Sequence, residues 1–427
     1  MIQSFILKDF KSYSEATLKL SPLTVLVGAN ASGKSNALEA IRFLSWLAQG
    51  QKLSSLQYKV NQDEQVVRGH VKDLFRHNAA HFVLGCTSDE QQAQLSISFD
   101  FRSNEELHIT EEICNFKEDF LYRTVKPTDK SATDISVEYN NFARGGKKPQ
   151  IVCNDQQGIF TQLSSAARFV DGHTKAQSLI PKISSFFEKQ LANILFLDPL
   201  PNQMRGYSFI SDKELRGDGS NLSAVLYHLW NEGESQQKDI LSFVQSLPEQ
   251  DIKSIDFLQG PRGEVMVQLV ETFGNKERKM DAGLLSDGTL RVLAIASALL
   301  SAPEGNMVIV EEIDNGVHPS RAKKLLESIN NIANKRQLNI LISSHNPALL
   351  DALPISAIPN VVFCYRDKKD GNSKLISLED VPDYPELISQ GSLGDLVTDG
   401  LLEKYVKNFE GKEAKKKKAL EWLEAIQ

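Results

Sequence analysis

The sequence predicts an α/β fold, with a mixed or parallel sheet flanked by helices, an α+β insertion and a C-terminal helical tail. The first observation behind this prediction is an apolar, β-branched run that ends in a glycine-rich loop and continues into a helical pattern, over residues 24–47. The second is a pair of short apolar runs, 307–310 and 339–342, that end in polar residues, as buried parallel strands do. The third is the long interval between these parts, which provides the insertion.

Composition places the chain among ordinary folded proteins. It has 427 residues, 41% of them hydrophobic and 24% charged, which argues against a disordered, collagen-like or disulfide-scaffold protein. The length allows two or three domains, or one large domain with an insertion. No run approaches the roughly 20 apolar residues of a membrane helix, and Lys8, Asp9 and Glu15 interrupt the region where a signal peptide would be apolar. We therefore expect a cytoplasmic protein with no membrane partner.

Net charge and cysteine spacing exclude further classes. Lys and Arg number 48 against 55 Asp and Glu, a net charge of −7, so the chain lacks the basic excess of an obligate nucleic-acid binder, although local basic patches stay open. The cysteines are far apart and lack the spacing of a zinc site or a disulfide framework. We predict reduced, mostly buried thiols at Cys86, Cys114, Cys153 and Cys364.

The glycine-rich loop has the Gly-x-x-x-x-Gly-Lys-Ser spacing of a phosphate-binding loop, or P-loop. Its glycines let backbone N–H groups curve around phosphates, and the helix that follows adds the positive end of its dipole. Lys34 is expected to reach the β- and γ-phosphates of a nucleotide, and Ser35 to ligate Mg²⁺. The candidate nucleotide-binding residues of this loop are Gly28, Ala29, Asn30, Ala31, Ser32, Gly33, Lys34, Ser35 and Asn36.

Polar side chains follow both of the later apolar strands. Two carboxylates end the strand 307–310, where a P-loop fold holds Mg²⁺ and polarises the attacking water. We assign Glu311 to the metal and Glu312 to the general base, so ATP and Mg²⁺ are the expected cofactors. In a parallel sheet the strand 339–342 would lie beside the first, and His345 could then reach a γ-phosphate.

A second anion-binding segment, Ser286-Asp287-Gly288, leads directly into an apolar helix. A Ser and a Gly at a helix start present N–H groups and the positive end of the helix dipole to an anion. The P-loop already serves the ATP bound by the same chain. We therefore expect this segment to contact the ATP of a second copy of the chain.

Four motifs, GANASGKSN, LSDGT, VIVEEID and SSHN, occur in an order that resembles the ABC-type, AAA-family ATPase heads of the SMC, RecF and OLD-like group. The start, MIQSFILKDFKSY, is similar to the N-terminal strand pair of those heads. The resemblance covers residues 1–50 and 280–370, and 180–230 more loosely. It extends to the ATPase subunits of bacterial anti-phage defence systems, such as PtuA of Septu.

The resemblance implies a P-loop ABC-type ATPase head that works in pairs. Two heads would sandwich two ATP molecules, each held by the P-loop of one chain and the Ser286–Gly288 segment of the other, in a homodimer or a higher oligomer. Lys11, in the FKSY segment, would lie close to the nucleotide. Asp314 would correspond to the loop that crosses the dimer interface, and His345 to the switch histidine.

Two features depart from that family pattern, and the Q-loop has no single candidate. Glu311 stands where the family more often has Asp, and Asp287 replaces the second residue of the usual Ser-Gly-Gly signature, which places a negative charge near a triphosphate. Turnover is therefore expected to be slow or to need a partner. For the Q-loop, which the family places beside the nucleotide, both Gln65 and the pair His77-Asn78 remain candidates.

The expected organisation has four parts. Residues 1–105 form the N-terminal part of the head, 106–250 an α+β lobe, 251–380 the C-terminal part of the head, and 381–427 a helical tail. No sustained heptads indicate a long coiled coil. Within these parts we expect strands at 82–86, 94–101, 193–197 and 361–365, helices at 177–193, 219–231 and 401–427, and a polar loop at 126–160.

These predictions combine into a Mg²⁺-dependent ATPase that regulates a separately encoded effector, such as a nuclease, in anti-phage defence. The chain itself is not expected to be a nuclease, because Asp380 and Asp383 lack a companion Glu on a preceding strand. The lysine run 415–418 in the tail is either a solvated face or a docking site for a partner or a DNA backbone. A RecF-like repair ATPase that binds DNA directly is the alternative; a transporter subunit is disfavoured by the long insertion.

Overall fold

The computed structural model describes residues 1–407, apart from 57–65, 89–90, 103–105, 126–132, 246–251, 274–275, 315–318, 382–383 and 390. Within this part of the chain no helix is long and apolar enough to cross a membrane. The longest helices with described bounds are α4 (Thr174–Ala192) and α9 (Pro319–Arg336). Gln65, Asp383 and the lysine run 415–418 lie outside the described residues.

The central layer is a six-stranded mixed sheet in the order β10-β15-β16-β3-β17-β18. Its first five strands run parallel, and β18 pairs antiparallel with β17. This confirms the predicted α/β class and the strands expected at 193–197 and 361–365. The strands are β3 (Leu23–Val27), β10 (Leu195–Leu197), β15 (Met307–Val310), β16 (Asn339–Ser344), β17 (Val361–Arg366) and β18 (Ser373–Ser377).

Both faces of this sheet are buried at β3, β15 and β16, which explains why these strands have nearly continuous apolar sequences. All five residues of β3 are buried, and alternate side chains enter two different cores. Val25 packs into the core shared with α6 (Leu222–Asn231) and α8 (Asp287–Ser301), whereas Leu26 packs into the core that contains α1 (Lys34–Ala48) and α4. The sheet therefore holds the P-loop between two packed layers.

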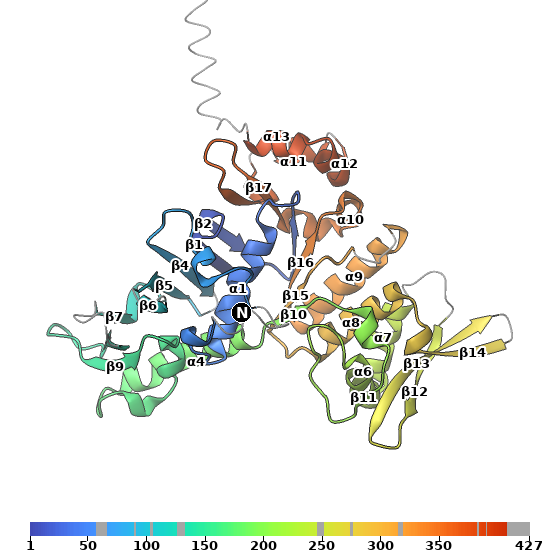
Figure 1. The fold of residues 1–427 in the computed structure, drawn as a ribbon, viewed down its shortest axis with the longest axis horizontal. Helices are drawn as coiled ribbons and strands as arrows, with labels where there is room; N and C mark the ends of the chain where they lie inside the picture. The colour runs from blue at the N-terminus through green and yellow to red at the C-terminus, as the bar shows by residue number, and fades with distance from the viewer. Residues whose placement is uncertain are drawn as a thin grey trace, which may run out of the picture.

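An eight-stranded antiparallel sheet, β2-β1-β4-β5-β6-β7-β8-β9, forms one wing of the molecule (Figure 1). It confirms the N-terminal strand pair and the strands expected at 82–86 and 94–101. The helix α4 lies against this wing, as expected for a helix at 177–193. The strands are β1 (Ser4–Phe10), β2 (Tyr13–Lys19), β4 (His81–Ser88), β5 (Ala93–Phe101), β6 (Leu107–Phe116), β7 (Asp119–Thr124), β8 (Asp134–Tyr139) and β9 (Gln150–Asn154).

The prediction of a loop over residues 126–160 is wrong, because β8 and β9 lie within it. In β8 the buried side chains alternate with more exposed ones: Ile135, Val137 and Tyr139 point into the core. The surrounding polar and glycine-rich residues hid this short period-two pattern, and residues 140–149, between the two strands, form a loop.

The opposite wing carries helices and a small antiparallel sheet that projects away from the centre (Figure 1). The helices α6 and α7 (Glu234–Val244) pack on α8, and α6 confirms the helix expected at 219–231. The small sheet consists of β11 (Ser208–Phe209), β12 (Ile252–Gln259), β13 (Glu264–Phe273) and β14 (Lys276–Asp281).

Short helices follow the mixed sheet at the C-terminal end. After β16, α10 (Pro347–Asp351) packs against α12 (Leu393–Thr398), which in turn contacts α13 (Leu401–Lys407). A further short helix, α11 (Tyr384–Ser389), lies beside them (Figure 1). The helical tail expected at 401–427 is therefore confirmed as far as residue 407, and the remainder lies outside the described residues.

Candidate nucleotide-binding site

The P-loop follows β3 and adopts a backbone that requires its glycines. Gly28 and Gly33 have φ of 155° and 121°, and Ala31 between them is left-handed at 61°. A Cβ at Gly28 would lie 2.1 Å from the carbonyl oxygen of Cys364, so no other residue fits there. This loop leads directly into α1, whose first N–H groups have no partner within the helix and suit an anion.

Side chains from distant parts of the chain hold the P-loop in this shape. The Tyr13 hydroxyl donates to the Gly33 carbonyl at 3.0 Å, and the Ser373 hydroxyl donates to the Ser32 carbonyl at 2.5 Å. Tyr13 begins β2 and Ser373 begins β18, so the N-terminal hairpin and the C-terminal hairpin meet on the loop. The P-loop is therefore pre-organised by tertiary contacts as well as by its own sequence.

Lys34 lies over the loop that it is expected to serve. Its Nζ donates to the carbonyl oxygens of Gly28 at 2.5 Å and Ala29 at 3.2 Å. Burial lowers the pKa of Lys34, while the nearby Glu312 and Asp314 favour its charged form. A half-buried ammonium beside orphan N–H groups is a cradle for a polyanion, so the residues present fit the triphosphate predicted from the sequence.

Glu311 follows β15, and hydrogen bonds fix both its backbone and its carboxylate. Its N–H donates to the Leu197 carbonyl at 3.0 Å, and its carboxylate accepts a hydrogen bond from the Arg42 guanidinium at 2.5 Å. Burial raises the pKa of Glu311, and Arg42 opposes that rise. The Ser35 hydroxyl lines the same cavity, and oxygen donors of this kind are the ligands that Mg²⁺ prefers. The pair therefore fits a metal ion, in competition with Arg42.

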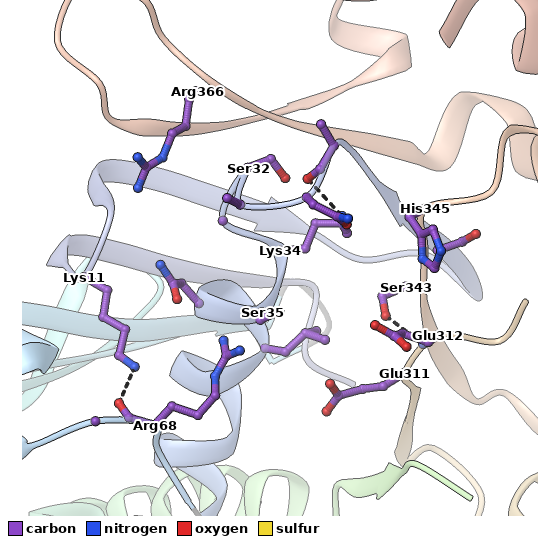
Figure 2. A pocket seen from close by; sticks show the side chains of 18 of the residues that line it. Lys11, Ser32, Lys34, Ser35, Arg68, Glu311, Glu312, Ser343, His345 and Arg366 are labelled. Atoms are coloured by element: carbon purple, nitrogen blue, oxygen red, sulfur yellow. Dashed lines mark hydrogen bonds between the residues drawn. The ribbon is translucent and has the colours of Figure 1, made fainter. Parts of the chain in front are cut away.

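Glu312 has a left-handed backbone, with φ of 47°, and its N–H donates to the Ser343 hydroxyl at 3.1 Å. A non-glycine residue in this region carries strain, which functional sites often contain. The turn brings the Glu312 carboxylate to the same side of Lys34 as Ser343 and His345 (Figure 2). The end of β15 and the end of β16 thus meet beside the P-loop, as parallel neighbours should.

His345 and Asp314 form a pair at this edge. The His345 side chain is 47% exposed, and its Nδ1 lies 3.5 Å from the Asp314 carboxylate, which is only 6% exposed. One oxygen of Asp314 has no hydrogen-bond partner in the described part of the chain. Asp314, expected to cross to a second chain, therefore faces His345 of its own chain here.

The P-loop, Glu311, Glu312 and His345 line one cavity of about 580 Å³ (Figure 2). Lys11 lies on its far side, where its Nζ donates to the Arg68 carbonyl at 2.9 Å and pairs with the buried carboxylate of Glu39. Arg68 pairs with the same carboxylate. The sequence-predicted residues that line the cavity are Lys11, Ala29, Asn30, Ala31, Ser32, Gly33, Lys34, Ser35, Asn36, Glu311, Glu312 and His345.

The segment Ser286–Gly288 is absent from the lining of that cavity. The Ser286 hydroxyl caps α8 by accepting a hydrogen bond from the Thr289 N–H at 3.1 Å. Asp287 is exposed and pairs with Arg205 at 2.5 Å. Within one chain, therefore, the P-loop and the Ser286–Gly288 segment belong to separate surfaces.

Of the Q-loop candidates, His77 and Asn78 line a neighbouring open cavity together with Lys11 and Arg76. They do not line the cavity that contains Lys34. Asp380, considered for a nuclease site, is instead paired with Lys19 at 2.7 Å. The four cysteines are free and buried, as predicted.

Several residues of the site were not found from the sequence. Glu39 and Arg42 follow Ser35 at spacings of four and seven, so one polar stripe of the otherwise buried helix α1 faces a neighbouring cavity, which Ser35 also lines. From this spacing the sequence could have predicted that both residues lie near Ser35. Asp198, after β10, borders the same region, and burial raises the pKa of its carboxyl. Arg366, at the end of β17, lies above the P-loop (Figure 2) and carried no signal of its own.

Comparison with known proteins places this site in context. The chain aligns with only 12% of the length of the DNA replication and repair protein RecF from Gloeobacter violaceus, at 56% identity over 45 residues, or 10% of the chain. An ATP/GTP phosphatase from Helicobacter pylori is 21% identical over 374 residues, which cover 83% of this chain and 87% of that protein.

Among solved structures, an SMC head bound to the C-terminal winged-helix domain of ScpA covers 88% of this chain and 98% of its own, with 16% identity and a TM-score of 0.46. An SMC head with an extended coiled coil, from Pyrococcus furiosus, covers 91% and 99%, with 15% identity and a TM-score of 0.42. A family model described as "AAA domain, putative AbiEii toxin, Type IV TA system" matches residues 23–351. Because this match spans well over half of the sequence, the chain belongs to that family of AAA-domain proteins.

Proposed function

We propose that the protein is a Mg²⁺-dependent ATPase, as the motifs predict. The observation that carries this proposal is the convergence of the P-loop, the carboxylates Glu311 and Glu312, and His345 on one cavity. A polyanion cradle beside two carboxylates at a strand end is the arrangement used to hydrolyse nucleoside triphosphates. The similarity to a relative named ATP/GTP phosphatase supports the same reaction.

Each residue has a part in the proposed reaction. Lys34 and the loop N–H groups neutralise negative charge on the β- and γ-phosphates, and they need little rearrangement because the loop is already shaped. Glu312 orients a water molecule and accepts its proton, and His345 contacts the γ-phosphate. Ser35 and Glu311 would hold Mg²⁺, which when bound supplies positive charge to the phosphate oxygens.

We also propose that the active form contains two copies of the chain. The Ser286–Gly288 segment presents a helix N-terminus but lies outside the lining of its own nucleotide cavity. A two-fold pair would let each copy offer this segment to the ATP of the other. The closed homodimer, or a larger assembly of such dimers, is then the ATP-bound state.

The proposed biological role is control of a separately encoded effector, such as a nuclease, by this ATP-dependent closure. The resemblance to anti-phage ATPase subunits favours this role, and so does a family description that names a toxin of a toxin–antitoxin system. The C-terminal helices α11–α13, at the edge of the molecule, provide a surface on which such a partner could dock (Figure 1).

Direct DNA binding is the second candidate role. It is favoured by the similarity to RecF, a protein named for DNA replication and repair, although the aligned part is short. If the chain clamps DNA itself, binding should require ATP and weaken steeply with salt, because phosphate contacts release counterions.

The test uses the Glu312→Gln variant, which should bind ATP but hydrolyse it about 10²–10⁴-fold more slowly. Size-exclusion chromatography with light scattering is run with and without ATP and Mg²⁺, in the presence of the protein encoded next to it. An ATP-dependent dimer that binds or releases that protein supports the proposal. A variant that hydrolyses ATP at the wild-type rate excludes Glu312 as the base.

A second outcome of the same experiment is a protein mass that is the same with and without ATP, and with and without the neighbouring protein. That result contradicts effector control and points to the DNA-binding alternative. Lys34→Ala combined with Glu312→Gln is the matched control, because it keeps the neutral base and removes the phosphate contact. It should remain monomeric in ATP.

A further inference from the structure

The first turn of α8 carries a charge that is unfavourable for the triphosphate that it is proposed to meet. Asp287 is 63% exposed and lies between Ser286 and Gly288, the two residues expected to approach the triphosphate of a second chain. A carboxylate there repels a polyanion, and the repulsion grows as closure excludes water. The site can work only if this charge is balanced.

Arg205 supplies a positive charge at this position. Its guanidinium donates from Nη2 to the Asp287 carboxylate at 2.5 Å, and from Nη1 to the carbonyl oxygens of Leu285 at 2.7 Å and Gly283 at 3.0 Å. A planar fork of N–H donors can make these three contacts at once, which a lysine ammonium on its flexible stem cannot reproduce. One side chain therefore balances the charge and fixes the backbone that precedes Ser286.

Arg205 itself is well anchored. It ends the short helix α5 (Pro201–Met204), whose Met204 is 1% exposed and packs in the core shared with α8. The same stretch of chain begins at β10, the neighbour of β15 in the central sheet. The Arg205 side chain is 30% exposed, so it remains at the surface that a second chain would cover.

We propose that Arg205 is a positioning residue for the ATP of the second chain. It neutralises the Asp287 carboxylate, so that Ser286 and the N–H groups at the start of α8 can approach the γ-phosphate. The Arg205–Asp287 pair thereby replaces the neutral residue of a Ser-Gly-Gly signature. This inference rests on the proposed ATP-dependent dimer.

A purely structural role predicts a different result. Asp287 in the first turn of α8 is favoured by the helix dipole, and Arg205 could simply support the loop. In that case removing both side chains should be at least as harmful as removing Arg205. If charge balance is what matters, removing both should restore function, because no unpaired carboxylate remains.

The experiment measures the ATP concentration that gives half-maximal dimerisation, by light scattering, in the Glu312→Gln background. Arg205→Ala should raise this concentration about tenfold or more, because it leaves Asp287 unpaired against the triphosphate. Asp287→Gly should lower it, since Arg205 is then free to attract phosphate. The double variant should return to within about threefold of the Glu312→Gln value, a non-additive result that reports coupling between the pair.

Controls separate this effect from folding and from the nucleotide contact within the chain. Arg216→Ala breaks a comparable exposed ion pair with Asp212, at 2.9 Å, and should leave dimerisation unchanged. Thermal unfolding and the affinity of the monomer for a fluorescent ATP analogue should be the same in Arg205→Ala as in its parent. Arg205→Lys should recover part of the loss, since it restores charge without the fork.

Two results would overturn the inference. One is a normal ATP requirement in Arg205→Ala; the other is a double variant as defective as Arg205→Ala alone, which would assign Arg205 to loop support. If the Glu312→Gln parent binds ATP but never dimerises, the proposed dimer itself is wrong, and this inference falls with it.

Discussion

The P-loop and the Ser286–Gly288 segment both stand at helix starts and are both proposed to bind phosphate, yet the chain builds them in opposite ways. The P-loop is held by hydrogen bonds from two distant hairpins, and Ser32 within it is 5% exposed. The other segment is exposed, with Leu284 62% accessible beside it, and one side chain, Arg205, holds its loop. We infer that the first surface binds nucleotide alone, whereas the second becomes a site only when another chain supplies the nucleotide.

The largest expected effect comes from a substitution in the P-loop and is measured as a loss of stability. Gly28→Ala places a Cβ against the Cys364 carbonyl in a backbone that side chains rarely adopt, and we expect a loss of about 4 kcal/mol in the free energy of unfolding. Chemical denaturation measures this. Gly206→Ala is the control, because its Cβ meets nothing within 4 Å, and it should change stability by less than about 0.5 kcal/mol. Equal stability for both variants would show that the loop is not held as described.

The next effect lies outside both surfaces, in the antiparallel wing. Burial raises the pKa of Glu112 to about 7, even though its carboxylate accepts hydrogen bonds from the Ile159 and Phe160 N–H groups and the Tyr122 hydroxyl. The folded pKa exceeds the unfolded value of about 4.5. The protonated carboxyl therefore favours the folded state at low pH, and this contribution is lost as pH rises through about 7.

We expect the free energy of unfolding to fall by up to about 3 kcal/mol between pH 4.5 and pH 8 through this group. Glu112→Gln should remove that slope, whereas Glu111→Gln, at an exposed neighbour, should keep it. ATP affinity at a fixed pH should be unaffected by either change, because neither Glu111 nor Glu112 lines the nucleotide cavity. A pH profile of unfolding that is the same in Glu112→Gln and wild type would count against this assignment.

The smallest expected effect is on ATP affinity, and it tests whether the Tyr13 hydrogen bond holds the P-loop in shape. Tyr13→Phe removes the hydrogen bond to the Gly33 carbonyl and should weaken ATP binding by about 1 kcal/mol, or about fivefold. Calorimetry with the Glu312→Gln variant measures this affinity without turnover. Tyr207→Phe, at an exposed tyrosine, is the matched control and should leave affinity unchanged. An unchanged affinity in Tyr13→Phe would mean that the loop keeps its shape without the N-terminal hairpin.

The sequence was most informative where function depends on local patterns. The P-loop, the strand ends at Glu311 and His345, and the helix start at Ser286 are each defined within a few residues, and the structure places them on the expected elements. The strands β3, β15, β16 and β17 were predicted equally well, because burial on both faces requires continuous apolar runs, whereas the edge strand β18 is partly exposed and was not predicted.

The ion pairs around the site could not be predicted from local sequence patterns. Arg42 meets Glu311 from 269 positions away, and Arg205 meets Asp287 from 82 positions away. No local period or spacing relates such residues, since the packing of whole layers brings them together. The strand β8 was missed for a different reason, because its alternating pattern is short and lies among polar residues.

The central claim, that each ATP site is shared between two chains, is tested most directly by mixing two inactive variants. Lys34→Ala removes the P-loop contact, and Ser286→Arg blocks the segment offered to the partner, so each variant alone should lose ATP hydrolysis. Random pairing makes half of the dimers mixed, and each mixed dimer regains one intact site, so the mixture should recover about a quarter of wild-type activity. A mixture as inactive as its two components would contradict the shared site.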